Sequence, residues 1–266
     1  VNILNMVFSG NILRIIPQPG DPNNTWASNH QHRGGDGHNH ALSTADKFFA
    51  AYKEALQKAY TTNDYSHAGH LLTELEAFQQ KNGGVIMPSS AKINGEIWLN
   101  ESRVFHRLTG MYLSLGLGFL FFLFLSVFRP GLNLKKAYWV LFSLVGLGFL
   151  LHTMGLGMRW YVSGRAPWSN GYESMIYIAW TTSLAGLIFT RKSLGGLAAT
   201  MVLSATVLLV ANLSYLDPEI TPLVPVLRSY WLTIHVSLEA GSYGFLMLGA
   251  LTGLINLILM IFLTEN

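Results

Sequence analysis

Long apolar runs restrict this chain to one broad class of fold. About 20 apolar residues cross the hydrocarbon core of a bilayer as a helix. Only 12% of the 266 residues are charged and 50% are hydrophobic, whereas soluble domains carry about 25% charged residues. The last run exceeds a straight crossing, which predicts a tilt or a break near Gly241 or Gly249. We expect an all-α membrane protein with five transmembrane helices, at residues 108–128, 137–158, 172–189, 194–213 and 230–263.

The short loops between these runs differ in charge, and the difference predicts an orientation. Lysine and arginine concentrate in the cytoplasmic loops of membrane proteins. If each run crosses once, two basic loops lie on the same side, and they carry Arg129, Lys135, Lys136, Arg191 and Lys192. We therefore expect the N-terminal region, the segment 159–173 and the loop 215–229 outside, and the C-terminus inside.

The region 1–105 is predicted to be extracytoplasmic, ahead of a transmembrane domain at 106–266. Apolar residues recur at helical spacing within 43–60 and again within 64–81. These two segments predict a helical hairpin outside the membrane. Residues 85–102 contain a proline followed by alternating apolar positions, which favours an extended connector.

A histidine-rich tract, HQHRGGDGHNH, occupies residues 30–40. Four histidines in one short segment can bind Zn²⁺ or Ni²⁺. No fixed spacing or carboxylate partner defines a site, and this favours the alternative, a disordered polar linker.

Other properties of the sequence exclude several functions. The chain has no cysteine, which rules out disulfides, thiolate metal sites and a cysteine nucleophile. The net charge is only +3 and no long basic face occurs, so nucleic acid is not an expected partner. Without a nucleophile–base pair or a glycine-rich phosphate loop, we assign no catalytic residue. The chain begins at Val1 without a signal-peptide pattern and ends directly after an apolar run, so we expect a piece of a longer protein.

The stretch 159–180, RWYVSGRAPWSNGYESMIYIAW, joins two apolar runs but contains arginines, a glutamate and several large aromatic residues. Charges at membrane depth are costly and usually face a protein interior or a watery cavity. Pro167 ends the preceding helix, and Ser169 or Asn170 can cap the next one, whose first turn carries Glu173. The alternative is an interfacial aromatic belt with snorkelling arginines.

Two histidines lie within the apolar runs. His152 is near the outer end of the second run and shares a helical face with Gly155 and Arg159. His235 is near the outer start of the last run, one turn before Glu239. Protein ligands to haem iron are typically histidines, because a neutral imidazole offers one nitrogen to the metal. The alternative for each is a hydrogen-bonded residue packed between helices.

A haem site at a membrane surface needs aromatic walls, an axial histidine and arginines for the propionates. The chain supplies possible walls in Trp160, Trp168, Tyr172 and Trp231, and possible propionate partners in Arg159, Arg165 and Arg228.

Two sequence blocks resemble the CcsA (ResC) family of system II cytochrome c maturation proteins. Residues 159–180 resemble the family pattern PxxNxYES with its following apolar run and tryptophan. Residues 223–251, LVPVLRSYWLTIHVSLEAGSYGFLMLGAL, resemble a second block, WLxIHVxxxxxSY. Residues 152–161 fit the segment before the first block. Residues 93–116 resemble the junction in bacterial forms that are fused to a CcsB (ResB) partner.

The resemblance implies a cytochrome c synthetase of the bacterial inner membrane, with the N-terminal region in the periplasm. Such a protein exports haem, holds haem b at the outer face and joins its vinyl groups to the CXXCH thiols of apocytochrome c. The implied partners are haem, apocytochrome c, a CcsB/ResB-like region and membrane lipid. By position, His235 matches one of two external axial ligands to the haem iron. From their chemistry we add His152, Arg159, Trp168 and Trp231 as cofactor-binding residues.

The chain stops before the family's tryptophan-rich WGxxWxWD segment and its second external histidine. We therefore expect it to hold at most part of the haem site and to represent only part of a haem lyase. The competing function is a non-catalytic membrane scaffold or transporter subunit whose histidines only pack. Loss of a haem absorbance band on changing His235 would separate the two.

Overall fold

The computed structural model describes residues 14–17, 26–27, 44–83, 87–129, 131–213, 216–220 and 229–262. The chain divides into two compact units, Val1–Ser89 and Ser90–Asn266, and each is described by itself. The predictions for the histidine-rich tract at 30–40 and for Arg228 fall outside the described residues.

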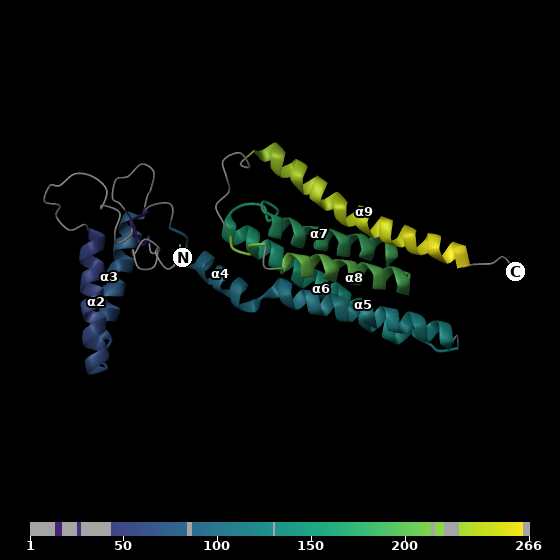
Figure 1. Cartoon of the computed structure of the whole chain (residues 1–266), viewed down its shortest axis with the longest axis horizontal. Helices are drawn as coiled ribbons and strands as arrows, with labels where there is room; N and C mark the ends of the chain where they lie inside the picture. Colours follow the sequence, from purple (N-terminus) through teal and green to yellow (C-terminus); the bar gives the residue numbers. More distant parts are fainter. Residues whose placement is uncertain are drawn as a thin grey trace. The chain divides into compact units, whose positions relative to one another are not determined.

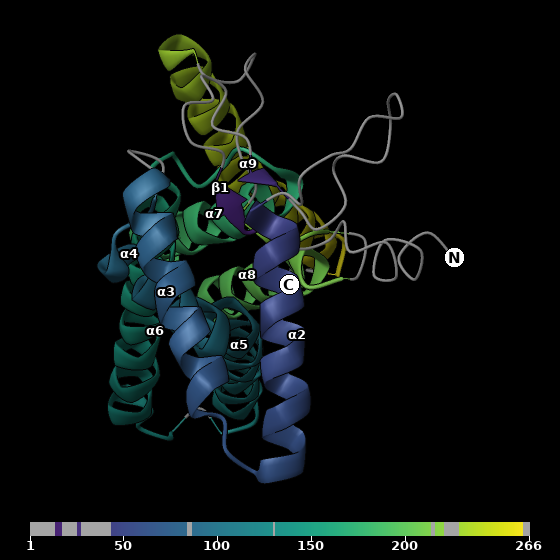
Figure 2. The same ribbon diagram turned by 90° about the vertical axis from the view of Figure 1, so that its left-hand side faces the viewer.

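A helical hairpin is the main part of the first unit, as predicted, and its place outside the membrane stays a prediction. Its elements are β1 (Ile16–Pro17), β2 (Trp26–Ala27), α2 (Thr44–Thr62) and α3 (Ser66–Asn82). The helices α2 and α3 lie side by side (Figure 2), and β1 pairs with β2 in antiparallel fashion. Leu75 of α3 and Ile16 of β1 are buried together. The Asp64 carboxylate accepts a hydrogen bond from the backbone N–H of Ser66, and this bond lowers the pKa of Asp64.

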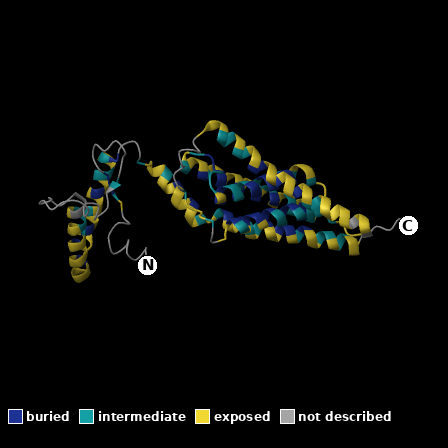
Figure 3. Ribbon diagram, turned by 45° about the horizontal axis from the view of Figure 1, so that its top comes forward, coloured by how far each residue is buried: buried dark blue, intermediate teal, exposed yellow. Residues whose placement is uncertain are grey.

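The second unit is a bundle of long helices. Its elements are α4 (Ser90–Ser102), α5 (Val104–Phe128), α6 (Lys135–Ser163), α7 (Gly171–Ala185), the π-helix η2 (Gly186–Thr190), α8 (Leu194–Ala211) and α9 (Tyr230–Phe262). Helix α5 packs on α6 and α8, α7 packs on α8, and α9 lies along α7 (Figure 1). The buried residues lie on the inside of this bundle, whereas α9 is exposed over most of its length (Figure 3).

Four helices in the described part of the chain are long and apolar enough to cross a membrane, at Ser90–Phe128, Lys135–Ser163, Leu194–Ala211 and Tyr230–Ile258. The chain is therefore an integral membrane protein with four candidate spans. The sequence predicted five, and the difference concerns 172–189, which forms the 15-residue α7 followed by η2. The segment 172–189 also contains the polar residues Thr182 and Ser183, which are buried in the bundle. The Ser183 hydroxyl donates a hydrogen bond to the Ser204 hydroxyl of α8 at 3.0 Å.

The sequence predicted a tilt or a break in the last apolar run near Gly241 or Gly249. Helix α9 continues through both glycines, so it contains no break there. A third glycine explains how closely α9 approaches α7. A Cβ atom at Gly244 would lie 2.3 Å from the Thr181 hydroxyl and 2.7 Å from the Thr182 backbone nitrogen. Glycine thus permits a close contact that any other residue would block.

The extended connector predicted for residues 85–102 is wrong for its second part, which forms α4. Gly95 and Leu99, one helical turn apart, are the buried residues of α4. A Cβ atom at Gly95 would lie 3.2 Å from Met158 of α6, so α4 rests on α6 through a small residue. The chain then bends at Arg103, whose φ of 44° is left-handed, before α5 begins.

Candidate functional site

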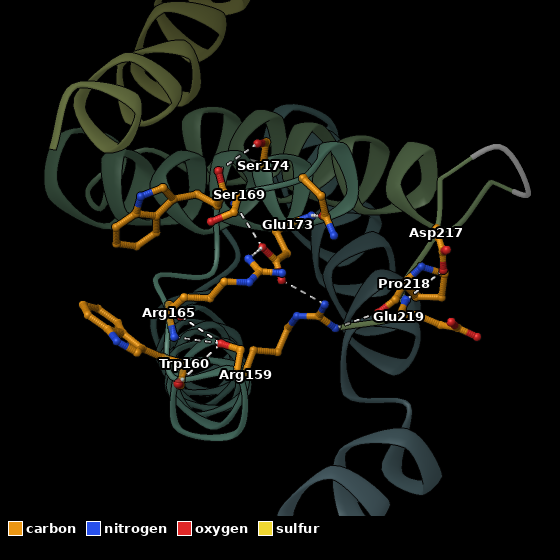
Figure 4. Close-up of polar contacts among 12 residues, drawn as sticks. Arg159, Trp160, Arg165, Ser169, Glu173, Ser174, Asp217, Pro218 and Glu219 are labelled. Carbon is orange, nitrogen blue, oxygen red and sulfur yellow. Dashed lines mark hydrogen bonds and ion pairs between the residues drawn. The ribbon is translucent and has the colours of Figure 1, made fainter. Parts of the chain in front are cut away.

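Glu173 is the centre of a buried ion network at the start of α7. Its side chain is fully buried and accepts hydrogen bonds from Arg159 Nη2 at 3.1 Å and Arg165 Nη1 at 2.6 Å (Figure 4). The backbone N–H of Ser169 also donates to this carboxylate, at 3.0 Å. Two guanidinium groups and an amide together compensate one carboxylate for its lost hydration.

The local sequence explains how these charges meet. Helix α6 ends at Ser163, before the predicted stop at Pro167, because its C-cap residue Gly164 adopts a left-handed φ of 68°. Asn170 then caps α7, because its Oδ1 accepts a hydrogen bond from the backbone N–H of Glu173 at 2.7 Å. The predicted cap at Ser169 or Asn170 is thus confirmed at Asn170. The acidic residue lies in the first turn, where the helix dipole favours a negative charge.

The guanidinium group of Arg159 binds other groups of the protein, although the sequence suggested it as a partner for a haem propionate. Its Nη1 donates to the carbonyl of Pro218 at 3.0 Å, and its guanidinium carbon lies 5.2 Å from the centre of the Tyr172 ring. Its Nε has no hydrogen-bond partner among the described residues. In this structure the charge of Arg159 neutralises Glu173 and its side chain ties α6 to the segment 216–220.

His152 lies between three helices and is fully buried. Its Nε2 is 3.0 Å from the carbonyl oxygen of Ile176 in α7, so this nitrogen carries the proton and donates it. Its Nδ1 is 3.3 Å from the hydroxyl of Tyr112 in α5 and therefore accepts. Both ring nitrogens are thus engaged by the protein, which is the geometry of the packed, hydrogen-bonded alternative.

Trp168 connects the loop before α7 to the start of α9. Its Nε1 donates a hydrogen bond to the carbonyl of Thr233 at 3.2 Å. The centre of its ring system lies 5.6 Å from that of Trp160 and 4.7 Å from that of Tyr177. A cavity of about 270 Å³ adjoins this contact, lined among others by Trp168, Thr233 and Val236. Aromatic rings therefore gather where the loop meets α9.

His235 and Trp231 lie one turn apart on the exposed face of α9. The exposed fraction is 73% for the His235 side chain and 76% for Trp231. His235 Nε2 lies 3.6 Å from a carboxylate oxygen of Glu239, and no described residue hydrogen-bonds its Nδ1. Tyr230 and Leu238 are also exposed here. This face offers an imidazole nitrogen beside apolar rings.

The predicted site residues do not form one cluster in the described structure. His152 is enclosed in the bundle, Arg159 is paired with Glu173, and Trp168 joins the loop to α9. Among the described residues no group of three or more histidine, aspartate or glutamate side chains could hold a metal ion. A group that needs only one protein ligand from this chain fits that arrangement, and His235 with Trp231 has the exposure that such a ligand requires.

The sequence reasoning did not anticipate that Glu173 would engage both arginines. The signal was present, because Glu173 is the only acidic residue between Glu101 and Asp217. A lone carboxylate flanked by two arginines in an apolar chain predicts an internal ion network.

The sequence of this chain is similar to that of known proteins of one family. Residues 168–266 match the family model described as Cytochrome C assembly protein. The chain is 37% identical over 272 residues to protein NrfI of Wolinella succinogenes, covering 98% of the chain and 28% of NrfI. It is 40% identical over 111 residues to the cytochrome c biogenesis protein CcsA of Prochlorococcus marinus strain MIT 9303, covering 40% of the chain and 35% of that protein.

A second CcsA, from Parasynechococcus marenigrum, is 36% identical over 152 residues, covering 52% of the chain and 48% of that protein. The chain thus spans less than half the length of each of these curated relatives. The family match covers Trp168, the cap of α7, Glu173 and the whole of α9. It therefore includes both partners of the hydrogen bond from Trp168 to the Thr233 carbonyl, which joins the loop before α7 to the helix of His235. The chain belongs to the cytochrome c assembly protein family, with CcsA and NrfI among its relatives.

Proposed function

We propose that this chain is part of a membrane cytochrome c synthetase that exports haem b and holds it at the outer membrane face for attachment to the CXXCH thiols of apocytochrome c. The observation that carries the proposal is the exposed His235 beside the exposed Trp231, on the helix that the family match includes. Bound haem would supply the vinyl groups to which the thiols are joined. The residues of this chain would bind and orient it.

Each residue near the start of α9 has a separate role in this proposal. His235 would offer an imidazole nitrogen to the haem iron, and Glu239, whose carboxylate lies 3.6 Å from Nε2, is the acidic neighbour of that ring. Trp231, one turn earlier, would cover part of the apolar body of the haem. Trp168 would act by position, since its bond to the Thr233 carbonyl fixes α9 against the loop.

We also propose five membrane crossings, with α7 and η2 together forming the third. These two elements comprise 15 and 5 consecutive residues, which together reach the length of one crossing. The hydroxyl of Tyr138 in α6 donates to the carbonyl of Arg191, so the two basic loops lie at the same end of the bundle. That end would face the cytoplasm of a bacterial inner membrane, and the N-terminal region with a CcsB-like partner region would lie in the periplasm.

A non-catalytic scaffold is the second candidate function, and His152 favours it. Both nitrogens of that histidine serve helix packing, as the scaffold reading expects of every histidine in the bundle. Under the synthetase proposal, His152 and Arg159 support the haem site only indirectly, by holding α5, α6 and α7 together. The two candidates therefore differ in their prediction for His235 alone.

Replacing His235 by alanine in the full-length protein tests the proposal. We expect bound haem, measured by its absorbance band, and cytochrome c maturation in cells to fall together, while the amount of protein in the membrane stays the same. His106→Ala is the matched control, because His106 is another exposed histidine near a helix start. Full haem content and full maturation in His235→Ala would reject the ligand role and favour the scaffold.

A further inference from the structure

A second cavity lies away from the network and from α9, between the start of α6 and the turn that precedes α8. Its volume is about 610 Å³. Three cationic and three aromatic side chains line it, and these are Lys135, Arg191, Lys192, Tyr138, Trp139 and Phe142. No step of the proposed function uses this cavity.

The three cations at the cavity lack acidic partners in the described structure. None of them forms an ion pair with a described carboxylate. Along the sequence, Glu173 is the only acid between Glu101 and Asp217, and its two oxygens are already bound by arginines. Three like charges placed around one cavity repel one another, so the arrangement is favourable when an anion lies among them.

The backbone adds to this positive potential. Helix α6 begins at the cavity, where the Asn133 side chain accepts a hydrogen bond from the backbone N–H of Lys135 at 3.1 Å and the N-cap residue Leu134 adds no further side-chain acceptor. The positive end of the helix dipole is therefore directed toward the same space as the cations. The hydrogen bond from Tyr138 to the Arg191 carbonyl holds the two sides of the cavity together.

The aromatic side gives the cavity an amphiphilic character. Tyr138 and Phe142 stack with ring centres 5.8 Å apart, and Trp139 meets Phe142 edge-on at the same distance. Trp139 is half exposed, and Leu147, two turns further along α6, is exposed as well. An apolar surface thus continues from the cations along a helix that is long and apolar enough to span a membrane.

We propose that this cavity binds the phosphate headgroup of an anionic phospholipid, whose acyl chains lie along the exposed apolar face of α6. Basic pockets between transmembrane helices on the cytoplasmic side are suited to such headgroups. The three cations of the cavity favour an anion as its ligand. The exposed apolar surface of α6 beside the cavity favours an anion that carries hydrocarbon chains. Haem is also an amphiphilic anion, but no histidine or methionine lines this cavity among the described residues, and the hydroxyl of Tyr138 is already bonded to the Arg191 carbonyl.

Quenching of Trp139 fluorescence tests the proposal in the full-length protein reconstituted into nanodiscs. The probes are phosphatidylglycerol and phosphatidylcholine with brominated acyl chains, and subtracting the Trp139→Phe signal isolates this tryptophan. We expect phosphatidylglycerol to quench at a much lower mole fraction than phosphatidylcholine. Lys135→Gln/Lys192→Gln should lower that preference by about fivefold for each cation removed.

The matched control is Arg129→Gln/Lys136→Gln, which removes one charge from the end of α5 and one from the start of α6 without altering the residues that line the cavity. It should keep most of the preference, and Lys135→Arg/Lys192→Arg should keep it as well. An equal loss in both glutamine pairs would mean only general attraction to the surface and would overturn the site. Displacement of the lipid by inorganic phosphate alone, or by haem with the same dependence on the cations, would overturn the lipid as its occupant.

Discussion

Two regions of the helical bundle, the ion network around Glu173 and the exposed face of α9 around His235, differ in how their polar groups are paired. Around Glu173 the charges are paired and largely enclosed, with two arginines and an amide on one buried carboxylate. Around His235 the polar and aromatic side chains are exposed, and one imidazole nitrogen has no partner among the described residues. In an apolar protein, groups satisfied inside the fold hold it together, whereas groups left open are available to a ligand.

This contrast assigns stability to one region and binding to the other. A substitution in the ion network should unfold the bundle, and its effect on haem should follow the amount of folded protein. A substitution on the exposed face of α9 should leave the fold intact and change only what the protein binds.

Glu173→Ala should have the largest effect, because it leaves Arg159 and Arg165 without their carboxylate. Removing one partner of a buried ion pair destabilises a protein by about 3–5 kcal/mol. We expect a much lower yield of folded protein and a lower midpoint of thermal unfolding in detergent. Glu219→Ala, at an exposed acid, is the control and should behave like the unaltered protein. A normal unfolding midpoint in Glu173→Ala would show that the network does not stabilise the bundle.

Gly244→Ala should weaken the contact between α9 and α7, because the added methyl group would overlap Thr181 and the backbone at Thr182. Overpacking of this kind costs about 1–3 kcal/mol. Thermal unfolding measures it, with Gly249→Ala as the control, since a Cβ at Gly249 meets nothing within 4 Å. Equal midpoints for the two variants would mean that α9 does not depend on the close approach.

Asn170→Ala should have a smaller effect, because it removes only the side-chain cap of α7. The loss of an N-cap costs about 1 kcal/mol. We expect slightly less folded protein but an unchanged haem spectrum per folded molecule, whereas Asn170→Ser should retain most of the stability because serine also caps helices. A normal protein level with a lost haem band would assign Asn170 to binding instead.

The sequence predicted those parts that depend on local rules. The hairpin of α2 and α3, the cap at Asn170 and the long apolar helices follow from helical spacing, capping chemistry and hydropathy. Helix α4 was missed because Pro88 and the i, i+2 spacing of Ile97 and Leu99 favoured a strand, although Ile93 and Ile97 are one helical turn apart. The buried face of α4, Gly95 and Leu99, is set by contact with α6.

The candidate site was harder to predict, because burial depends on contacts between distant helices. Spacing placed His152 and Arg159 on one face of α6, and both are indeed buried. Spacing could not show that Tyr112, Ile176 and Glu173 would engage them from other helices. For His235 the structure shows an exposed side chain, whereas its place at the outer membrane face and its role as a ligand stay predictions.

The most direct test of this contrast is the haem spectrum of His235→Gly, recorded with and without added imidazole. Because the His235 side chain is exposed, its removal should not affect folding, and a free imidazole should reach the vacated position. The account predicts that His235→Gly loses bound haem and that imidazole restores part of the haem absorbance and of cytochrome c maturation. Haem content in His235→Gly equal to that of the unaltered protein, with no response to imidazole, would contradict the assignment of the exposed face of α9 to haem.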